Sequence, residues 1–112
     1  MSRKQALTEL IAKVEAGSED TPDFSALVSR PLMQCKAGEA YRGSLDAAKA
    51  LHEAVLPKNC FWWVEHRPDG QFQSGVAVGN LGRCFQAFAD TPARAWLLAI
   101  LRALHAQEGG EA

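Results

Sequence analysis

The stretch CFWWVEHRPDGQFQSGVAV, residues 60–78, decides the fold class. Both of its halves are rich in the aromatic and β-branched residues that strands favour, and they flank the sequence RPDG at 67–70. Proline at the second and glycine at the fourth position are typical of a type I turn with a left-handed glycine bulge. The stretch therefore predicts a β-hairpin in which Arg67 pairs with Gln71.

That pairing fixes which side chains share each face of the hairpin, because side chains alternate along a strand and cross-strand partners lie on one side. One face would carry Trp62, Val64, Phe72, Val76 and Val78. The other face would carry Phe61, Trp63, Glu65, Gln71, Gln73, Gly75 and Ala77. We interpret the first face as core and expect any function on the second.

The sequence after the hairpin predicts one more strand and a helix. Residues 79–82, GNLG, are typical of a turn, so the next segment, 83–89, would complete an antiparallel three-stranded meander. Thr91 can then cap a helix whose first position is Pro92, where proline has no hydrogen bond to lose. We expect this last helix to run to about Ala106.

Two further helices are predicted before the hairpin. Apolar residues recur at helical spacing between Ser2, a possible cap, and Gly17, a typical stop. Ser44 can open a helix that Pro57 closes. Between them, residues 23–28 predict a short helical piece that Pro31 ends or interrupts, and residues 32–43 have no readable pattern.

The last helix is apolar nearly all round, although Leu98 falls beside its charged positions, Arg94, Arg102 and His105. Such a helix is either buried in the core or helps to bury a partner. Trp62 and Trp63, being neighbours on a strand, also need cover on opposite sides. We therefore expect an α+β fold of order α-(α)-α-β-β-β-α with helices on both faces, an α/β/α sandwich, or one helical face and a subunit contact.

Length and composition indicate one domain spanning residues 1–112, with an ordered core at about 4–106 and a flexible tail at 107–112. The chain has 112 residues, 47% of them hydrophobic, and a net charge of −1, which provides no overall field for a polyanion. Its longest apolar run, at 95–101, is too short to cross a bilayer, and its start does not resemble a signal peptide. We expect a soluble protein without membrane contact.

The sequence offers little support for catalysis or cofactor binding. Three cysteines without a CxxC pair favour a reducing cytoplasm, and their spacing from the three histidines does not suit zinc, so we expect no metal and no cofactor. The cysteines are interpreted as buried and the histidines as surface residues. Glu65 and Asp69 are interpreted as solvated turn residues and not as a catalytic pair. We expect no enzymatic activity.

The order of segments resembles the phage ABA sandwich domain family, small phage and prophage proteins of uncharacterised function. The sequence YRGSLDAA at 41–48 is similar to the family's YTxSLDAAL element, which precedes an aromatic strand, and DTPARA at 90–95 is similar to its ATPALAL element, which opens the last helix. The sequence LIAKVE at 10–15 resembles its N-terminal helix. The resemblance implies a layered α/β/α fold, a phage origin and the host bacterial cytoplasm, with no catalytic residues.

Two functions follow as hypotheses. The first is a non-catalytic protein-interaction module whose protein partner is unknown, with a homodimer as one option. Its candidate interaction surface is Phe61, Trp63, Glu65, Arg67, Gln71, Gln73 and Leu98. The alternative is a single-stranded nucleic-acid binder that stacks bases on Phe61 and Trp63. Nucleic acid is the weaker hypothesis, because only Arg67 and Arg83 would supply positive charge nearby.

Overall fold

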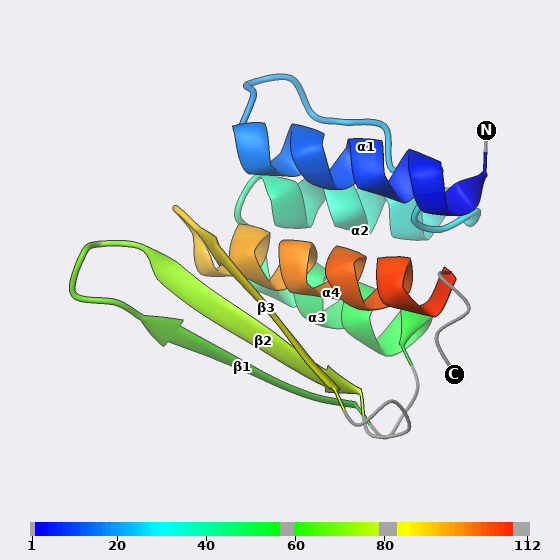
Figure 1. Ribbon diagram of the computed structural model, residues 1–112. Helices are drawn as coiled ribbons and strands as arrows, with labels where there is room; N and C mark the ends of the chain where they lie inside the picture. Colours follow the sequence, from blue (N-terminus) through cyan, green and yellow to red (C-terminus); the bar gives the residue numbers. More distant parts are fainter. Residues whose placement is uncertain (1, 57–59, 79–82, 109–112) are drawn as a thin grey trace.

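The computed structural model describes residues 2–56, 60–78 and 83–108. Its elements follow the predicted α+β order (Figure 1). They are α1 (Arg3–Ala16), α2 (Pro31–Tyr41), α3 (Leu45–Val55), β1 (Cys60–His66), β2 (Phe72–Val78), β3 (Arg83–Ala89) and α4 (Pro92–Glu108). The last helix is longer than predicted and includes residues 107 and 108. The predictions at Pro57, at 79–82 and at 109–112 lie outside the described residues.

The predicted caps at Ser2, Ser44 and Thr91 and the predicted stop at Gly17 are confirmed. The side-chain oxygens of Ser2, Ser44 and Thr91 each accept a hydrogen bond of 3.1–3.2 Å from the backbone N–H three residues further on. Gly17 ends α1 with a φ of 68°, in the left-handed region that favours glycine. Local capping chemistry therefore sets the bounds of α1 and the starts of α3 and α4.

The segment between α1 and α3 differs from the prediction. Residues 25–27 form a turn in place of the short helix expected at 23–28, and the N–H groups of Leu27 and Val28 both donate to the carbonyl of Phe24. Pro31 does not interrupt a helix; it begins α2, because proline suits the first helical position. Small residues on α2, Ala37, Gly38 and Ala40, are buried against the rest of the core.

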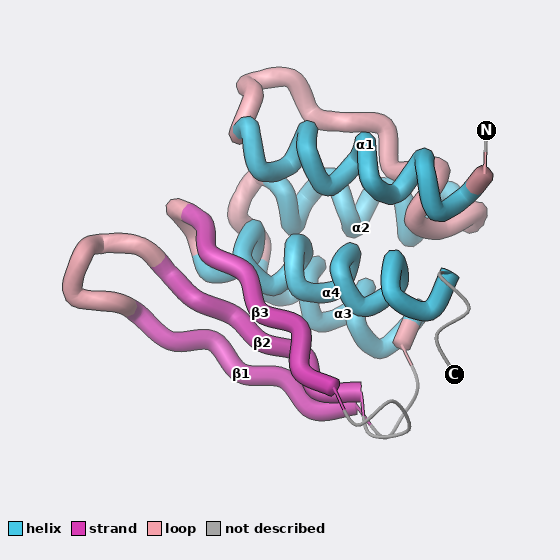
Figure 2. The backbone as a smooth tube through the Cα atoms, in the orientation of Figure 1, coloured by secondary structure: helices cyan, strands magenta, loops and turns pink. Residues whose placement is uncertain are grey.

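The three strands form one antiparallel sheet in the order β1-β2-β3 (Figure 2). The predicted register is confirmed, since Trp62 pairs with Val76, Trp63 pairs with Gly75, and the Arg67 N–H donates to the Gln71 carbonyl at 2.8 Å. The second ladder extends the two faces onto β3. It sets Phe85, Ala87 and Ala89 on the Trp62 side, and Cys84, Gln86 and Phe88 on the Trp63 side.

All four described helices lie on one side of the sheet, so the expected α/β/α sandwich is wrong and the arrangement with one helical face is found (Figure 1). Helix α4 packs mainly on β2 and β3, touches β1 less, and is itself contacted by α1, α2 and α3. The apolar residues around α4 are thus buried between the sheet and the other helices. No described helix is left to cover the second sheet face.

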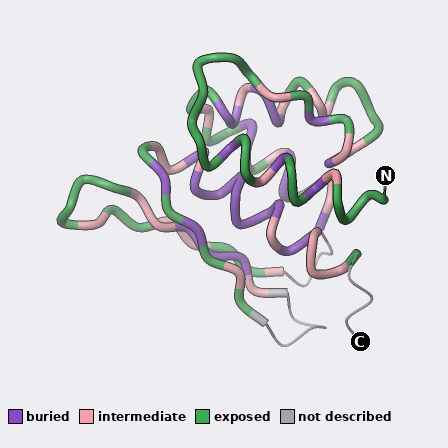
Figure 3. The backbone as a smooth tube through the Cα atoms, turned by 45° about the horizontal axis from the view of Figure 1, so that its top comes forward, coloured by how far each residue is buried: buried purple, intermediate pink, exposed green. Residues whose placement is uncertain are grey.

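Helix α4 is buried on the side where an exposed Leu98 was expected. Leu98 is only 2% exposed, because α1 packs along this side: Arg102 forms an ion pair with Glu15, and the His105 ring lies 2.8 Å from the Thr8 hydroxyl. In Figure 3 the helices carry most of the buried residues, and the hairpin end of the sheet is exposed. None of the described helices, α4 included, has the length and apolar character needed to cross a bilayer.

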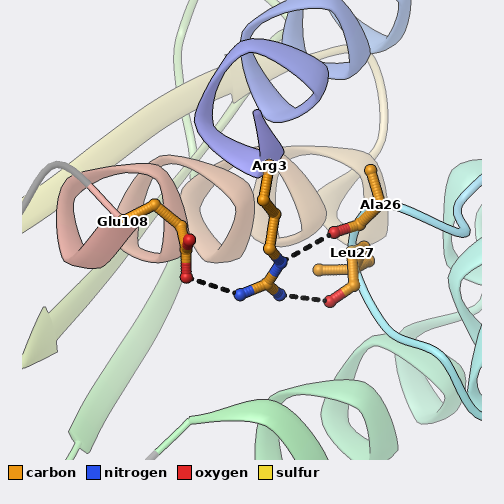
Figure 4. Close-up of polar contacts among 4 residues, drawn as sticks. All are labelled: Arg3, Ala26, Leu27 and Glu108. Carbon is orange, nitrogen blue, oxygen red and sulfur yellow. Dashed lines mark hydrogen bonds and ion pairs between the residues drawn. The ribbon is translucent and has the colours of Figure 1, made fainter. Parts of the chain in front are cut away.

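Arg3 joins the start of the first helix to the end of the last (Figure 4). Its guanidinium donates to the carbonyls of Ala26 and Leu27 at 3.1 and 2.9 Å, and it pairs with the Glu108 carboxylate at 2.7 Å. The start of α1, the turn at 25–27 and the last residue of α4 therefore meet at one side chain.

Candidate interaction surface

The sheet face opposite the helices gathers most of the predicted surface residues. We call it the open face and define it by its outward side chains, Phe61, Trp63, Glu65, Gln73, Gly75, Ala77, Cys84, Gln86 and Phe88. Phe61 on β1 is 70% exposed and Phe88 on β3 is 46% exposed. Large aromatic side chains therefore face outward on both edge strands of the sheet.

Trp63 is partly covered by its own sheet. A Cβ atom placed on Gly75 would lie 2.0 Å from Cζ2 of Trp63, so the indole ring extends from β1 across the bare backbone of β2. Any larger residue at position 75 would displace the ring. Gly75 is buried and Trp63 is half-buried as a result, which leaves a flat aromatic surface in the middle of the open face.

Polar side chains join the hairpin turn, β2 and β3 across the open face. The Gln73 side-chain amide donates to the Gln86 side-chain oxygen at 2.8 Å, which joins β2 to β3. The Arg67 guanidinium lies 5.1 Å from the centre of the Phe88 ring and donates to the Gln73 side-chain oxygen at 3.4 Å. These contacts place the Arg67 cation over Phe88 and join β2 to β3 beside it.

The open face carries little net charge. Arg67 lies 3.5 Å from the Asp69 carboxylate, which also accepts a hydrogen bond of 3.0 Å from the Gln71 N–H. That backbone hydrogen bond, and secondarily the charge of Arg67, lower the pKa of Asp69 below its ordinary value. Glu65 is exposed on the same face, so the prediction that Glu65 and Asp69 are solvated is confirmed.

The structure brings together all but one of the predicted surface residues. Phe61, Trp63, Glu65 and Gln73 lie on the open face, Arg67 and Gln71 lie at its hairpin end, and Leu98 is excluded by burial under α1. Sequence reasoning missed Phe88 and Gln86. Continuing the side-chain alternation from β2 onto β3 would have found them, but the connection at 79–82 hides that register.

The helix-facing side of β1 contains an aromatic stack with one partly exposed end. The Trp62 ring stacks on Trp96 with centroids 4.0 Å apart, and the Trp96 indole N–H donates to Nδ1 of His52 at 3.3 Å. His52 is 5% exposed, so its predicted surface position is wrong, and burial lowers its pKa. Trp62 is 44% exposed although it faces the helices, because α4 extends only partly over β1.

Reactive side chains are scattered among the described residues. Cys35 and Cys84 are exposed, which corrects their expected burial, while Cys60 is half-buried and burial raises the pKa of its thiol. No three metal-ligating side chains come together in the part of the chain that the structure describes. A hollow of about 500 Å³ is lined by Cys35 and Glu39, but none of the three histidines lines it. This hollow lacks the imidazole that would activate a thiol nucleophile.

Comparison with known proteins adds no relative. Neither a protein-family model, nor a curated protein, nor a solved structure matches this chain. The resemblance to the phage ABA sandwich domain family therefore stays a prediction.

Proposed function

We propose that this chain is a non-catalytic protein-interaction module, encoded by a phage or prophage, that binds a protein through its open face in the cytoplasm of the host bacterium. The observation that carries the proposal is the exposure of Phe61 and Phe88, at 70% and 46%, on a sheet face that the described helices leave uncovered. Phe61 and Phe88 lie at opposite corners of this face, with Trp63 between them. Exposed aromatic residues among polar ones are typical of protein-binding sites.

The chemistry of the open face suits a protein partner. Aromatic side chains supply most of the binding free energy at protein interfaces when they enter a partner's pocket, and Arg67 adds a cation at the rim. The amide and guanidinium contacts that link β2 and β3 reduce the entropy lost on binding, because these side chains are already ordered.

The same charges argue against the nucleic-acid alternative. Single-strand binders combine stacking aromatics with a positively charged groove that follows the phosphates. Here the cation of Arg67 is offset by Asp69 at 3.5 Å, and Glu65 adds a further negative charge on this face. Stacking surface is present on the open face, but the counterion-releasing charge is weak.

A reconstituted complex tests the proposal. The tagged chain is used to capture proteins from a bacterial lysate, and each captured protein is then purified and titrated against wild type, Phe88→Gln and Leu32→Gln. Leu32 is the matched control, because it is a 66% exposed apolar residue on α2, away from the sheet. We expect Phe88→Gln to weaken the complex by at least about tenfold and Leu32→Gln to leave it unchanged.

Results from two experiments, the reconstitution and an oligonucleotide titration, would contradict the proposal. In the first, the contradicting result is a reconstituted complex that Phe88→Gln does not weaken, or the failure of every captured protein to bind after purification. In the second, it is tryptophan quenching by single-stranded oligonucleotides that weakens steeply with salt, which would favour the nucleic-acid alternative.

A further inference from the structure

We infer that a second copy of this chain pairs with the outer edge of β1, in an antiparallel two-fold dimer with one continuous six-stranded sheet. The inference goes beyond the proposed function, because it assigns a second copy of the chain to the β1 edge, beside the open face that the proposed host partner would use. It depends on three features of the structure: the state of the two sheet edges, the exposure on both sides of β1, and the charges along this strand.

The two edges of the sheet present their backbone groups differently. Hydrogen-bonded pairs alternate along an antiparallel ladder, and the bond from the Arg67 N–H to the Gln71 carbonyl sets the phase. The N–H and C=O groups of Trp62 and Val64 therefore point away from β2, toward the β1 edge. At the other edge the same alternation turns the backbone groups of Gln86 outward.

Only one of these edges is guarded by a side chain of the described residues. An Arg102 guanidinium nitrogen donates to the Gln86 carbonyl at 2.7 Å, and Glu15 of α1 holds that guanidinium by an ion pair. Covering an edge in this way is a recognised means of preventing strand pairing. Over the described ranges, β1 is the end of the sheet order and carries no such cover.

Exposed aromatic surface on both sides of β1 favours a partner at its edge. Phe61, 70% exposed, faces outward, whereas Trp62, 44% exposed, faces the helices. A partner lying on the open face would cover Phe61 but could not reach Trp62. A strand paired with β1 places its own side chains beside both of these aromatic residues.

The charges of β1 suit antiparallel pairing with a second copy. A two-fold axis at Trp63 pairs all seven residues, sets Trp62 opposite the partner's Val64 in a hydrogen-bonded pair, and sets Phe61 opposite the partner's Glu65. The two Glu65 carboxylates then lie about 14 Å apart along the strands, beyond the screening length of about 8 Å at physiological salt. Parallel pairing would instead place them side by side.

The apolar area at this edge fits a reversible dimer. Phe61 and Trp62 together expose roughly 250 Å² per copy, given side chains of about 150–250 Å² each. Two copies would bury about 500 Å² from these residues alone, roughly a third of a standard interface of about 1,600 Å². The seven-residue strand and its flanking side chains supply the remainder.

Sedimentation of the purified full chain tests the inference with matched variants. Val64→Pro removes an edge-facing N–H from β1, and Gln86→Pro removes the corresponding N–H from β3. Neither N–H bonds β2, so proline leaves the sheet ladder intact in both variants. Phe61→Gln and Phe88→Gln form a second matched pair on the open face. We expect wild type to dimerise at micromolar concentration, and Val64→Pro and Phe61→Gln to raise the dimer dissociation constant at least about tenfold. Gln86→Pro and Phe88→Gln should leave it unchanged.

Three results would overturn the inference: wild type that stays monomeric at high micromolar concentration, a dimer insensitive to Val64→Pro and Phe61→Gln, or a dimer weakened equally by Phe61→Gln and Phe88→Gln. The last would indicate that two open faces stack on each other. If Val64→Pro does not fold, as judged by circular dichroism, the pair Phe61→Gln and Phe88→Gln decides. If the chain is monomeric but its complex with a host protein is weakened by Phe88→Gln, only the dimer is contradicted. If the chain dimerises but binds no host protein, only the proposed function is contradicted.

Discussion

The edge strands β1 and β3 are attached to the same helix by different chemistry. β1 is attached through the aromatic stack of Trp62 on Trp96, which ends at the imidazole of His52 on α3. β3 packs more closely on the helix, with Ala87 fully buried, and it has in addition a polar attachment through Arg102, which bonds the Gln86 carbonyl and Glu15. The comparison teaches that an apolar attachment fastens a strand from one side and leaves its edge open, whereas a polar attachment can occupy the edge itself.

Among these variants, truncation of Trp96 in the aromatic attachment should lower the free energy of unfolding most. Trp96 is 1% exposed, so Trp96→Ala should lower the free energy of unfolding by about 3–5 kcal/mol, because it leaves a cavity and removes the surface on which Trp62 stacks. Urea denaturation measures the loss, and hydrogen exchange should show greater deprotection in β1 than in β3. Phe88→Ala is the control and should cost less, since Phe88 is 46% exposed. Equal losses in the two variants would contradict this assignment.

Acid should weaken the β1 attachment. Nδ1 of His52 accepts the Trp96 N–H, and burial lowers the folded-state pKa of His52 below its unfolded value of about 6.5. The unfolded chain then binds more protons, so this residue's contribution is constant above about pH 6.5 and falls as the pH drops below it. The slope should not exceed about 1.4 kcal/mol per pH unit. Urea denaturation between pH 7.5 and about pH 5 should show this fall, and His52→Asn should reduce it; an unchanged profile in the variant would assign the effect elsewhere.

Loss of the Arg102 contact with β3 should lower the free energy of unfolding least. Arg102 and Glu15 are both partly exposed, so Arg102→Ala should cost only about 1 kcal/mol, from one hydrogen bond to a carbonyl and one screened ion pair. Denaturation at low and high salt should show the difference shrinking as salt rises. Arg102→Lys keeps the charge but not the two-pronged contact, and it should fall between wild type and alanine. A salt-independent loss would argue against the ion pair.

Local chemistry explains what could be predicted from the sequence. The RPDG turn fixes the hairpin register through Arg67 and Gln71, and Ser2, Ser44 and Thr91 cap their helices within three residues, so no distant contact is needed. The two faces of the hairpin follow from that register by alternation alone. Most of the candidate surface was therefore predictable.

Tertiary contacts explain what could not be predicted from the sequence. Arg102 and His105 indicate a solvent-facing side of α4, yet both form contacts with α1 and bury Leu98 between the helices. Arg94 likewise bonds the Tyr41 carbonyl at 2.8 Å and lies 4.1 Å from the centre of that ring. A long charged side chain can cover apolar surface while its head finds a partner, so charge alone does not mark exposure. The gathering of all the described helices on one side of the sheet depends on such contacts between helices.

The position of Trp63 over Gly75 has an optical consequence. The chain has three tryptophans, and two of them, Trp62 and Trp96, stack at 4.0 Å, so that their electronic transitions couple to each other. Trp63 lies on the opposite side of the sheet, on bare backbone, so a partner on the open face would change its surroundings directly. Near-ultraviolet dichroism should therefore follow the packing of Trp62 on Trp96, and a change in tryptophan emission that leaves this dichroism unchanged would point to Trp63.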